Sequence, residues 1–301
     1  MDHSNRLCLR ALLTGLTLAL ILGACGTGAG HAPGASSSAG AASAVSSETS
    51  AASVLSSAPA SVSAASQAAS AAAASPAPAT DSSVPSGTLA GKVICVDPGH
   101  QQKVDLTREA EAPGSDVMKI KNPGGATGVK TGVPEYGLNL AVALKLRGLL
   151  QARGVTVVMT RTDNGGNIGN IQRAQMANDC HADLFVRLHA DSTDSASVHG
   201  ATMLIPGGQF IRDAALLRES RRAGGYLLDS YIAATGAKNR GFSERSDMTG
   251  FNWCTRPMVL VEMGFLSNPD EDALMQTDAY RQKMAQGLAD GICRYLAAGS
   301  G

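Results

Sequence analysis

Three apolar runs that each lead to a histidine or a glutamate constrain the fold of this chain more than any other feature. The run KVICV is broken by DPG just before His100, the run DLFVRL leads to His189, and the run MVLV leads to Glu262. Each run has the length and composition of one buried strand. Ligands of open α/β sheets bind outside the carboxyl ends of the strands, so we expect these three side chains to meet at one edge of a sheet.

The remaining predicted elements indicate an α/β fold. A helix is expected to begin at Pro134-Glu135, because proline is favoured at the first helical position and apolar residues follow at helical spacing. Further strands are expected at 155–159 and 200–205, and further helices at 168–179, 211–235, 270–277 and 278–296. This alternation predicts a single domain with a mostly parallel, twisted sheet covered by helices on both faces.

Composition separates this domain from the N-terminal part of the chain. Residues 25–87 consist mainly of Ala, Ser, Pro and Gly and contain no Phe, Trp, Tyr or Ile, so they have too little apolar bulk to offset the entropy of ordering. We therefore expect a disordered linker at 25–88 and a folded domain at 89–301. Lysine plus arginine and aspartate plus glutamate number 25 each, a balance that argues against nucleic acid as a partner.

The first residues have the pattern of an export signal. Arg6 and Arg10 precede the apolar run ALLTGLTLALI, which is too short to span a bilayer as an ordinary membrane helix. The LGAC that follows resembles the lipobox of bacterial lipoproteins, which implies a signal peptide at 1–24 and a lipid on Cys25. The other interpretation is an ordinary secretory signal with an incidental cysteine. We expect a protein outside the cytoplasm, anchored to the cell membrane by its lipid and a flexible linker.

Four of the six cysteines lie in the folded domain: Cys95, Cys180, Cys254 and Cys293. Outside the cytoplasm they could form two disulfides, in any of three pairings. Their spacing contains no CxxC pattern for zinc. Cys95 lies inside an expected buried strand, where a small apolar thiol packs well, so we expect at least this cysteine to be free.

Two polar segments are candidates for the surroundings of a site. Residues 101–133 are Gly-rich, and we expect an irregular loop that serves as a lid or rim and could cover the site. Residues 238–256 could present the following side chains to a polar ligand: Arg240, Arg245, Asp247 and Trp253. In the alternative interpretation, Trp253 is ordinary core and the charges lie on a solvated loop. His181 and His199 are expected on the surface or in loops.

The residue types at the expected sheet edge suit the hydrolysis of an amide by zinc. Catalytic zinc takes three protein ligands from histidine and carboxylate and keeps a fourth position for water. His100, Glu135 and His189 supply that set. Glu262 remains as a second carboxylate, which would accept a proton from water and return it to the departing nitrogen. Glu135 also has a simpler interpretation, since a glutamate in the first turn of a helix compensates the helix dipole.

Four longer blocks occur in order along the domain. They are VDPGH, a glutamate followed by LNLAVALKLRGLLQARGVTVVMTR, then ANDCHADLFVRLHADS, and PMVLVEMGFLSNPDE. They resemble the signature blocks of the zinc-dependent N-acetylmuramoyl-L-alanine amidases called amidase type 3. The resemblance implies zinc ligands at His100, Glu135 and His189 and a catalytic glutamate at Glu262. It also implies that residues 89–301 cleave the amide between the lactyl group of N-acetylmuramic acid and the first L-alanine of the peptidoglycan stem peptide.

The chain departs from the family pattern in its loops. Gln101-Gln102 follow DPGH where many members have a Gly-rich stretch and an aspartate, and a long insertion precedes Glu135. The segment ERSDMTGFNW is also outside the general signature. Two other functions remain open: a zinc peptidase or deacetylase acting on peptidoglycan, and a non-catalytic wall-binding lipoprotein. We expect the protein to act as a monomer.

Overall fold

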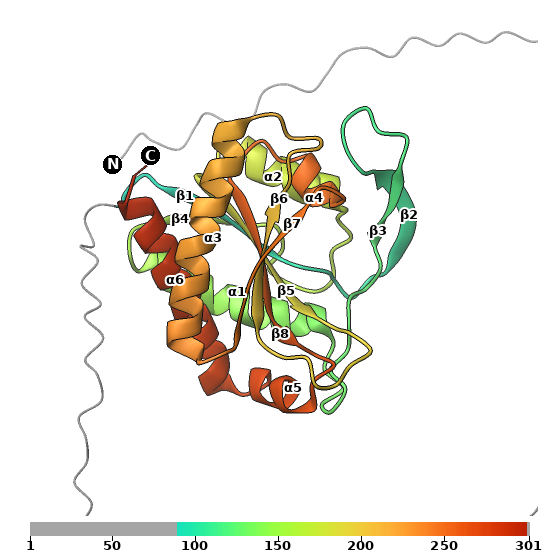
Figure 1. Cartoon of the computed structure of the whole chain (residues 1–301), viewed down its shortest axis with the longest axis vertical. Helices are drawn as coiled ribbons and strands as arrows, with labels where there is room; N and C mark the ends of the chain where they lie inside the picture. Colours follow the sequence, from blue (N-terminus) through green and yellow to red (C-terminus); the bar gives the residue numbers. More distant parts are fainter. Residues whose placement is uncertain (1–88, 300–301) are drawn as a thin grey trace, which may run out of the picture. The chain divides into compact units, whose positions relative to one another are not determined.

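A six-stranded sheet with helices on both faces forms the centre of the computed structural model, which describes residues 89–299 (Figure 1). The expected signal peptide, Cys25 and the linker lie outside the described residues. The strands are β1 (Val93–Pro98), β2 (Asp105–Ala110), β3 (Met118–Asn122), β4 (Thr156–Met159), β5 (Leu184–Asp191), β6 (Ala201–Pro206), β7 (Asn239–Arg245) and β8 (Met258–Phe265). The helices are α1 (Glu135–Gln151), α2 (Asn170–Asp179), α3 (Ala214–Thr235), α4 (Thr249–Asn252), α5 (Pro269–Met275) and α6 (Asp278–Ala297).

The six strands lie in the order β4-β1-β5-β8-β6-β7. β1 pairs in parallel with β4 and β5, β5 with β8, and β6 with β7, whereas β6 and β8 are antiparallel. The expected α/β fold with a mostly parallel sheet is therefore confirmed. The central strands β1, β5 and β8 are buried almost throughout. Strands covered on both faces need apolar residues at successive positions, which is why these three read as continuous apolar runs.

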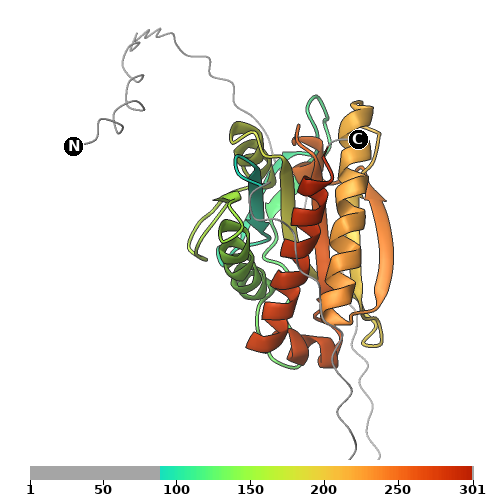
Figure 2. The ribbon, with the colours of Figure 1, turned by 90° about the vertical axis from the view of Figure 1, so that its left-hand side faces the viewer.

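Successive residues of the central strands point to opposite faces and supply two separate cores. Ile94 and Val96 pack in the core of α1, α3 and α6, whereas Cys95 between them packs in the core of α2 and α4. α3 and α6 run side by side in both views (Figures 1 and 2). Gly287 and Gly291 of α6 permit this approach, because a Cβ at these positions would lie 2.8 and 2.7 Å from Cα atoms of α3.

The segment 101–133 contains regular structure, so the expectation of one irregular loop is wrong. β2 and β3 form an antiparallel hairpin that is separate from the main sheet (Figure 1). Glu109 of this hairpin caps α2, since its carboxylate accepts hydrogen bonds from the N–H groups of Asn170 and Ile171 at 2.7 and 3.3 Å. A hairpin outside the core needs no buried apolar face, so its sequence lacks the usual strand signal. Several of its apolar side chains are exposed: Leu106, Met118 and Ile120.

The segment 238–256 is also more regular than expected. It contains β7, at the edge of the sheet, and the single turn of α4. Trp253 is partly buried and packs against the core of α2 and α4, and its Nε1 donates a hydrogen bond to the carbonyl of Ala110 at 2.9 Å. The core interpretation is therefore correct for this tryptophan. Arg245 and Asp247 form a two-pronged ion pair, with N···O distances of 2.7 and 2.8 Å.

All four cysteines within residues 89–299 are free. Cys95 is fully buried in β1, as expected for a small apolar thiol. The same residues contain no helix with the length and apolar character needed to cross a membrane.

Candidate metal centre

Three side chains from separate segments meet at the carboxyl edge of the central strands. His100 lies just beyond β1, Glu135 is the first residue of α1, and His189 lies in β5. Ligand atoms of the three residues all lie within 4.8 Å of one another. The structure thus brings together the three residues that the sequence indicated as metal ligands.

The carboxylate of Glu135 lies between the two histidines. Its Oε1 is 3.1 Å from His189 Nδ1, and its Oε2 is 3.3 Å from His100 Nε2. The two imidazole rings meet edge to face, with their centroids 4.8 Å apart. The same carboxylate accepts hydrogen bonds from the N–H groups of Ala126 at 2.9 Å and Ala190 at 3.2 Å. Glu135 therefore does more than compensate the dipole of α1.

The protonation states of His100 and Glu135 suit a bound cation. Burial, together with the nearby His189, lowers the pKa of His100 to about 4, so its imidazole is neutral at pH 7. Burial acts to raise the pKa of Glu135, but the hydrogen bond and the electrostatic interaction with His189, together with smaller contributions from His100 and the N–H of Ala126, outweigh burial and lower that pKa to about 2. Neutral imidazole and ionised carboxylate are the forms in which these side chains bind metals.

The donor atoms also fit a metal ion. Nε2 of His189 is buried and has no hydrogen-bond partner among the described residues, which is costly for a polar nitrogen unless a ligand satisfies it. Two histidines and a glutamate form a ligand set that zinc hydrolases use with an open position for water. Since imidazole and carboxylate suit several first-row metals, the donor set by itself indicates a transition-metal site.

A further carboxyl group, that of Glu262, faces the same space. Glu262 of β8 is in register with His189 of β5, and both line a pocket of about 270 Å³ together with His100 and Glu135. Burial, reinforced by the charges of Glu135 and Asp191, raises the pKa of Glu262 well above its ordinary range. Its Oε2 is buried and makes no hydrogen bond within the described part of the chain. Glu262 is thus a carboxyl group that can hold a proton beside the candidate metal ligands.

His189 and Glu262 lie inside strands rather than just beyond them. β5 continues to Asp191 and β8 continues to Phe265, so both strands extend a few residues past the point where the apolar run ends, although the two side chains still lie near the carboxyl edge of the sheet. A strand ends where backbone pairing ends, and the pairing of β5 with β8 extends past the apolar runs. Both side chains are therefore held by paired backbone on either side.

Two glycines make room for the three candidate ligands. A Cβ on Gly99 would lie 2.3 Å from the His189 ring, and one on Gly125 would lie 2.7 Å from Glu135 Oε2 and 2.8 Å from the His100 ring. Gly125 has a φ of +81°, a conformation that favours glycine. Gly125 and its neighbour Ala126 line the pocket, so the connection between β3 and α1 borders the site. These glycines carry no signal in the sequence, because their role depends on which side chains approach them in space.

Four residues that the sequence suggested for contacts with a polar ligand are not among the residues that line the pocket: Arg240, Arg245, Asp247 and Trp253. The charge of Arg245 nevertheless acts on the pocket residue Glu262, where it opposes the raised pKa. Arg240 instead lies over the ring of Phe265, 5.1 Å from its centroid. His181 and His199 are exposed, as expected. Asp191 does line the pocket, although sequence reasoning did not select it. The sequence did hold an indication of this role, because Asp191 follows the candidate ligand His189 by two residues in the block RLHADS.

The chain is similar to known proteins along most of its described residues. The family model described as N-acetylmuramoyl-L-alanine amidase matches residues 94–294. The chain is 31% identical over 226 residues to N-acetylmuramoyl-L-alanine amidase Rv3717 of Mycobacterium tuberculosis, a match that covers 72% of this chain and 92% of that protein. It is 26% identical over 219 residues to the probable cell wall amidase LytH of Staphylococcus aureus, covering 72% of this chain and 63% of that protein. The crystal structure of the N-acetylmuramyl-L-alanine amidase Ami1 from Mycobacterium smegmatis matches with a TM-score of 0.65 and 29% identity, covering 70% of this chain and 99% of that one.

Proposed function

Because the chain belongs to the N-acetylmuramoyl-L-alanine amidase family, we propose that it hydrolyses the amide between N-acetylmuramic acid and L-alanine with zinc held by His100, Glu135 and His189. Its substrate is peptidoglycan, and the reaction serves cell-wall remodelling or lysis. Glu262 is the catalytic residue that moves the proton.

One observation carries this proposal: the candidate ligands and Glu262 line the same pocket of about 270 Å³. Amide hydrolysis needs a group that activates the carbonyl and a group that both accepts and returns a proton. A protein that only bound the wall would have no use for a buried carboxyl group without a partner beside two histidines, since such groups cost stability. The arrangement therefore favours catalysis over binding alone.

The chain's own residues take the following roles in the reaction. Zinc, when bound, supplies a Lewis acid that polarises the lactyl carbonyl and lowers the pKa of water to about 7. Glu262 accepts a proton from the attacking water and donates it to the alanine nitrogen as that nitrogen departs. The charge of the bound cation would favour the ionised form of Glu262 that accepts the first proton. Burial, which raises the pKa of this carboxyl group, then favours its keeping the proton until the leaving nitrogen takes it.

We also propose that the enzyme acts outside the cytoplasm as a lipid-anchored monomer. Residues 1–24 are then the signal peptide, Cys25 carries the lipid, and residues 25–88 link it to the catalytic domain at 89–301. The apolar run followed by LGAC supports this assignment. A linker without apolar bulk lets the domain reach the wall polymer while the lipid holds it at the membrane.

Digestion of purified peptidoglycan tests the activity. The expected products are stem peptides with a free L-alanine amine and glycan strands with free lactyl carboxyl groups. A peptidase would instead create termini inside the stem peptide, and a deacetylase would release acetate. Metal analysis should find zinc in the folded protein, and removal by a chelator should abolish an activity that added zinc restores. Peptidoglycan left intact by the zinc-loaded protein would contradict the proposal.

Cell fractionation tests the anchor. The wild-type protein should appear in the membrane fraction and Cys25→Ala in the soluble fraction, because that variant lacks the thiol that carries lipid. Cys8→Ala is the matched control, since Cys8 lies within the expected signal peptide and is removed with it. Equal membrane association of Cys25→Ala and the wild type would contradict a lipid on this cysteine.

A further inference from the structure

We propose that Arg161 and Arg173 are positioning residues that aim His100 at the metal by holding the backbone of the turn Pro98–His100. The inference rests on the proposed function, because it concerns one of the proposed zinc ligands. It assigns a role in metal binding to two buried arginines that lie behind the pocket.

The turn itself requires support. His100 has a φ of +58°, in the left-handed region that residues with a Cβ rarely adopt. Gly99 before it passes against the ring of His189, so the turn is confined on that side as well. Such a strained conformation persists only when surrounding contacts stabilise it, and it is common at functional sites, where a side chain needs a defined orientation.

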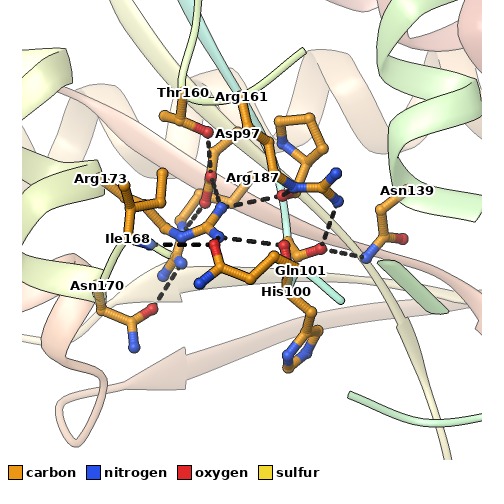
Figure 3. A network of polar contacts seen from close by, with 12 residues as sticks. Asp97, His100, Gln101, Asn139, Thr160, Arg161, Ile168, Asn170, Arg173 and Arg187 are labelled. Atoms are coloured by element: carbon orange, nitrogen blue, oxygen red, sulfur yellow. Dashed lines mark hydrogen bonds and ion pairs between the residues drawn. The ribbon is translucent and has the colours of Figure 1, made fainter. Parts of the chain in front are cut away.

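Arg173 of α2 supplies the first set of contacts. Its Nη1 donates to the carbonyl of Pro98 at 3.0 Å, and its Nη2 donates to the carbonyl of His100 at 3.1 Å. Nη2 also donates to Oε1 of Gln101 at 2.9 Å. A planar guanidinium can make these hydrogen bonds at the same time, so this one side chain binds the first and the last residue of the turn (Figure 3).

Arg161, which follows β4, supplies the second set. Its Nε donates to the carbonyl of Pro98 at 2.8 Å, and its Nη2 donates to the carbonyl of Gly99 at 3.0 Å. The same Nη2 donates to the carbonyl of Tyr136 at 2.8 Å. Tyr136 follows Glu135, so this nitrogen ties the turn that carries one ligand to the helix that carries another.

Asp97 fixes Arg173 in place. Its fully buried carboxylate accepts hydrogen bonds from Arg173 Nη1, from Arg187 Nε at 2.8 Å and from the hydroxyl of Thr160 (Figure 3). Arg187 shares this partner, but its other hydrogen bond goes to Oδ1 of Asn170. Within residues 89–299, Arg187 makes no hydrogen bond to a carbonyl of the turn.

Arg187 is therefore a matched control for Arg173. Both side chains are 3% exposed and both pair with Asp97, so replacing either one removes one buried charge and one ion pair. If the arginines only stabilised the fold, Arg173→Met and Arg187→Met would weaken zinc binding equally. If Arg173 positions His100, only its replacement disturbs the turn.

The experiment measures the zinc dissociation constant of each folded protein by competition with a chelator, together with its unfolding by urea. We expect Arg173→Met and Arg161→Met to weaken zinc binding by about 10–100-fold, the range for residues that orient a metal ligand. Arg187→Met should change the zinc dissociation constant by less than about 3-fold, although this variant also loses stability because it breaks a buried ion pair with Asp97. Arg173→Lys should recover stability, because lysine keeps the positive charge beside Asp97. It should not recover zinc affinity, because a single ammonium group cannot donate to both turn carbonyls as the planar guanidinium does.

The outcomes separate this inference from the proposed function. Wild-type protein that is folded and binds no zinc would overturn the proposed function and this inference with it. Wild-type protein that binds zinc, with Arg173→Met bound as tightly or weakened no more than Arg187→Met, would overturn the inference alone. If Arg173→Met does not fold, Arg161→Met decides in the same way, and unchanged zinc affinity in that variant overturns the inference.

Discussion

His189 of β5 and Glu262 of β8 are register partners on adjacent parallel strands. Parallel strands lie about 4.8 Å apart, so the sheet itself sets the spacing between a candidate metal ligand and the group proposed to move the proton. His100 and Glu135 reach the same pocket from outside the sheet. Strands of the sheet therefore position His189 and Glu262, whereas the turn after β1 positions His100 and the start of α1 positions Glu135.

Glu262→Gln should retain zinc but lower turnover by about two to four orders of magnitude, the usual contribution of a general acid and base. The amide keeps the size of the side chain but cannot accept and return the proton. Turnover on purified peptidoglycan and zinc content are measured on the same preparation. Asp191→Asn, in the same pocket, is the comparison and should lose much less. Full activity of Glu262→Gln would remove this residue from the mechanism.

Gly99→Ala should weaken zinc binding and activity by more than about 10-fold, because the added Cβ would lie 2.3 Å from the ring of His189 and must displace it. Gly137→Ala is the control. A Cβ there meets nothing within 4 Å, and alanine in the helix α1 should stabilise the protein by about 0.5–1 kcal/mol. Zinc titration and thermal unfolding of both variants test this pair. Normal zinc affinity in Gly99→Ala would show that the His189 ring can move at no cost.

Asp97 should make stability depend on pH in the acid range. Burial acts to raise its pKa, but the charges of Arg173 and Arg187 and the hydrogen bond from Thr160 outweigh burial and hold the pKa well below its ordinary range. Its contribution is therefore complete above the unfolded pKa of about 3.9 and decreases as the pH falls below that value, because the unfolded state takes up the proton first.

Asp97→Asn removes this titration. At pH 7 the variant should be less stable than the wild type by about 3 kcal/mol, since two buried arginines lose their charged partner. The difference in the free energy of unfolding between the two proteins should become smaller from pH 4 to pH 3. Urea unfolding at each pH measures this difference. A difference that stays constant from pH 7 to pH 3 would contradict the assignment.

Asp272 of α5 should stabilise the loop that precedes α1. Its buried carboxylate accepts hydrogen bonds from the N–H groups of Lys130 and Thr131, both at 2.8 Å, and from the Thr131 hydroxyl at 2.7 Å. Asp272→Ala leaves these donors without a partner and should lower the free energy of unfolding by about 3 kcal/mol. The exposed Asp270 of the same helix is the control, and Asp270→Ala should cost less than about 1 kcal/mol. Urea denaturation compares them, and equal losses would contradict this role.

The sequence by itself determined the central strands and the residues of the candidate site. β1, β5 and β8 are buried on both faces, so their side chains had to be apolar at successive positions and each run could be recognised without its neighbours. Charged or metal-binding residues next to such runs are conspicuous for the same reason. His100, His189 and Glu262 were found in this way, and the predicted helix start located Glu135.

Only the tertiary structure decided which contacts distant residues make. The local pattern of Glu135 suits simple compensation of a helix dipole, and its contact with His189, 54 residues away, shows the further role. The ion pair of Asp97 with Arg173 joins residues 76 positions apart, and the hairpin β2–β3 carries exposed apolar residues that give no strand signal. The physical reason is that periodicity in a sequence reports burial, whereas ion pairs, close approaches to glycine and the order of strands depend on which segments meet in space.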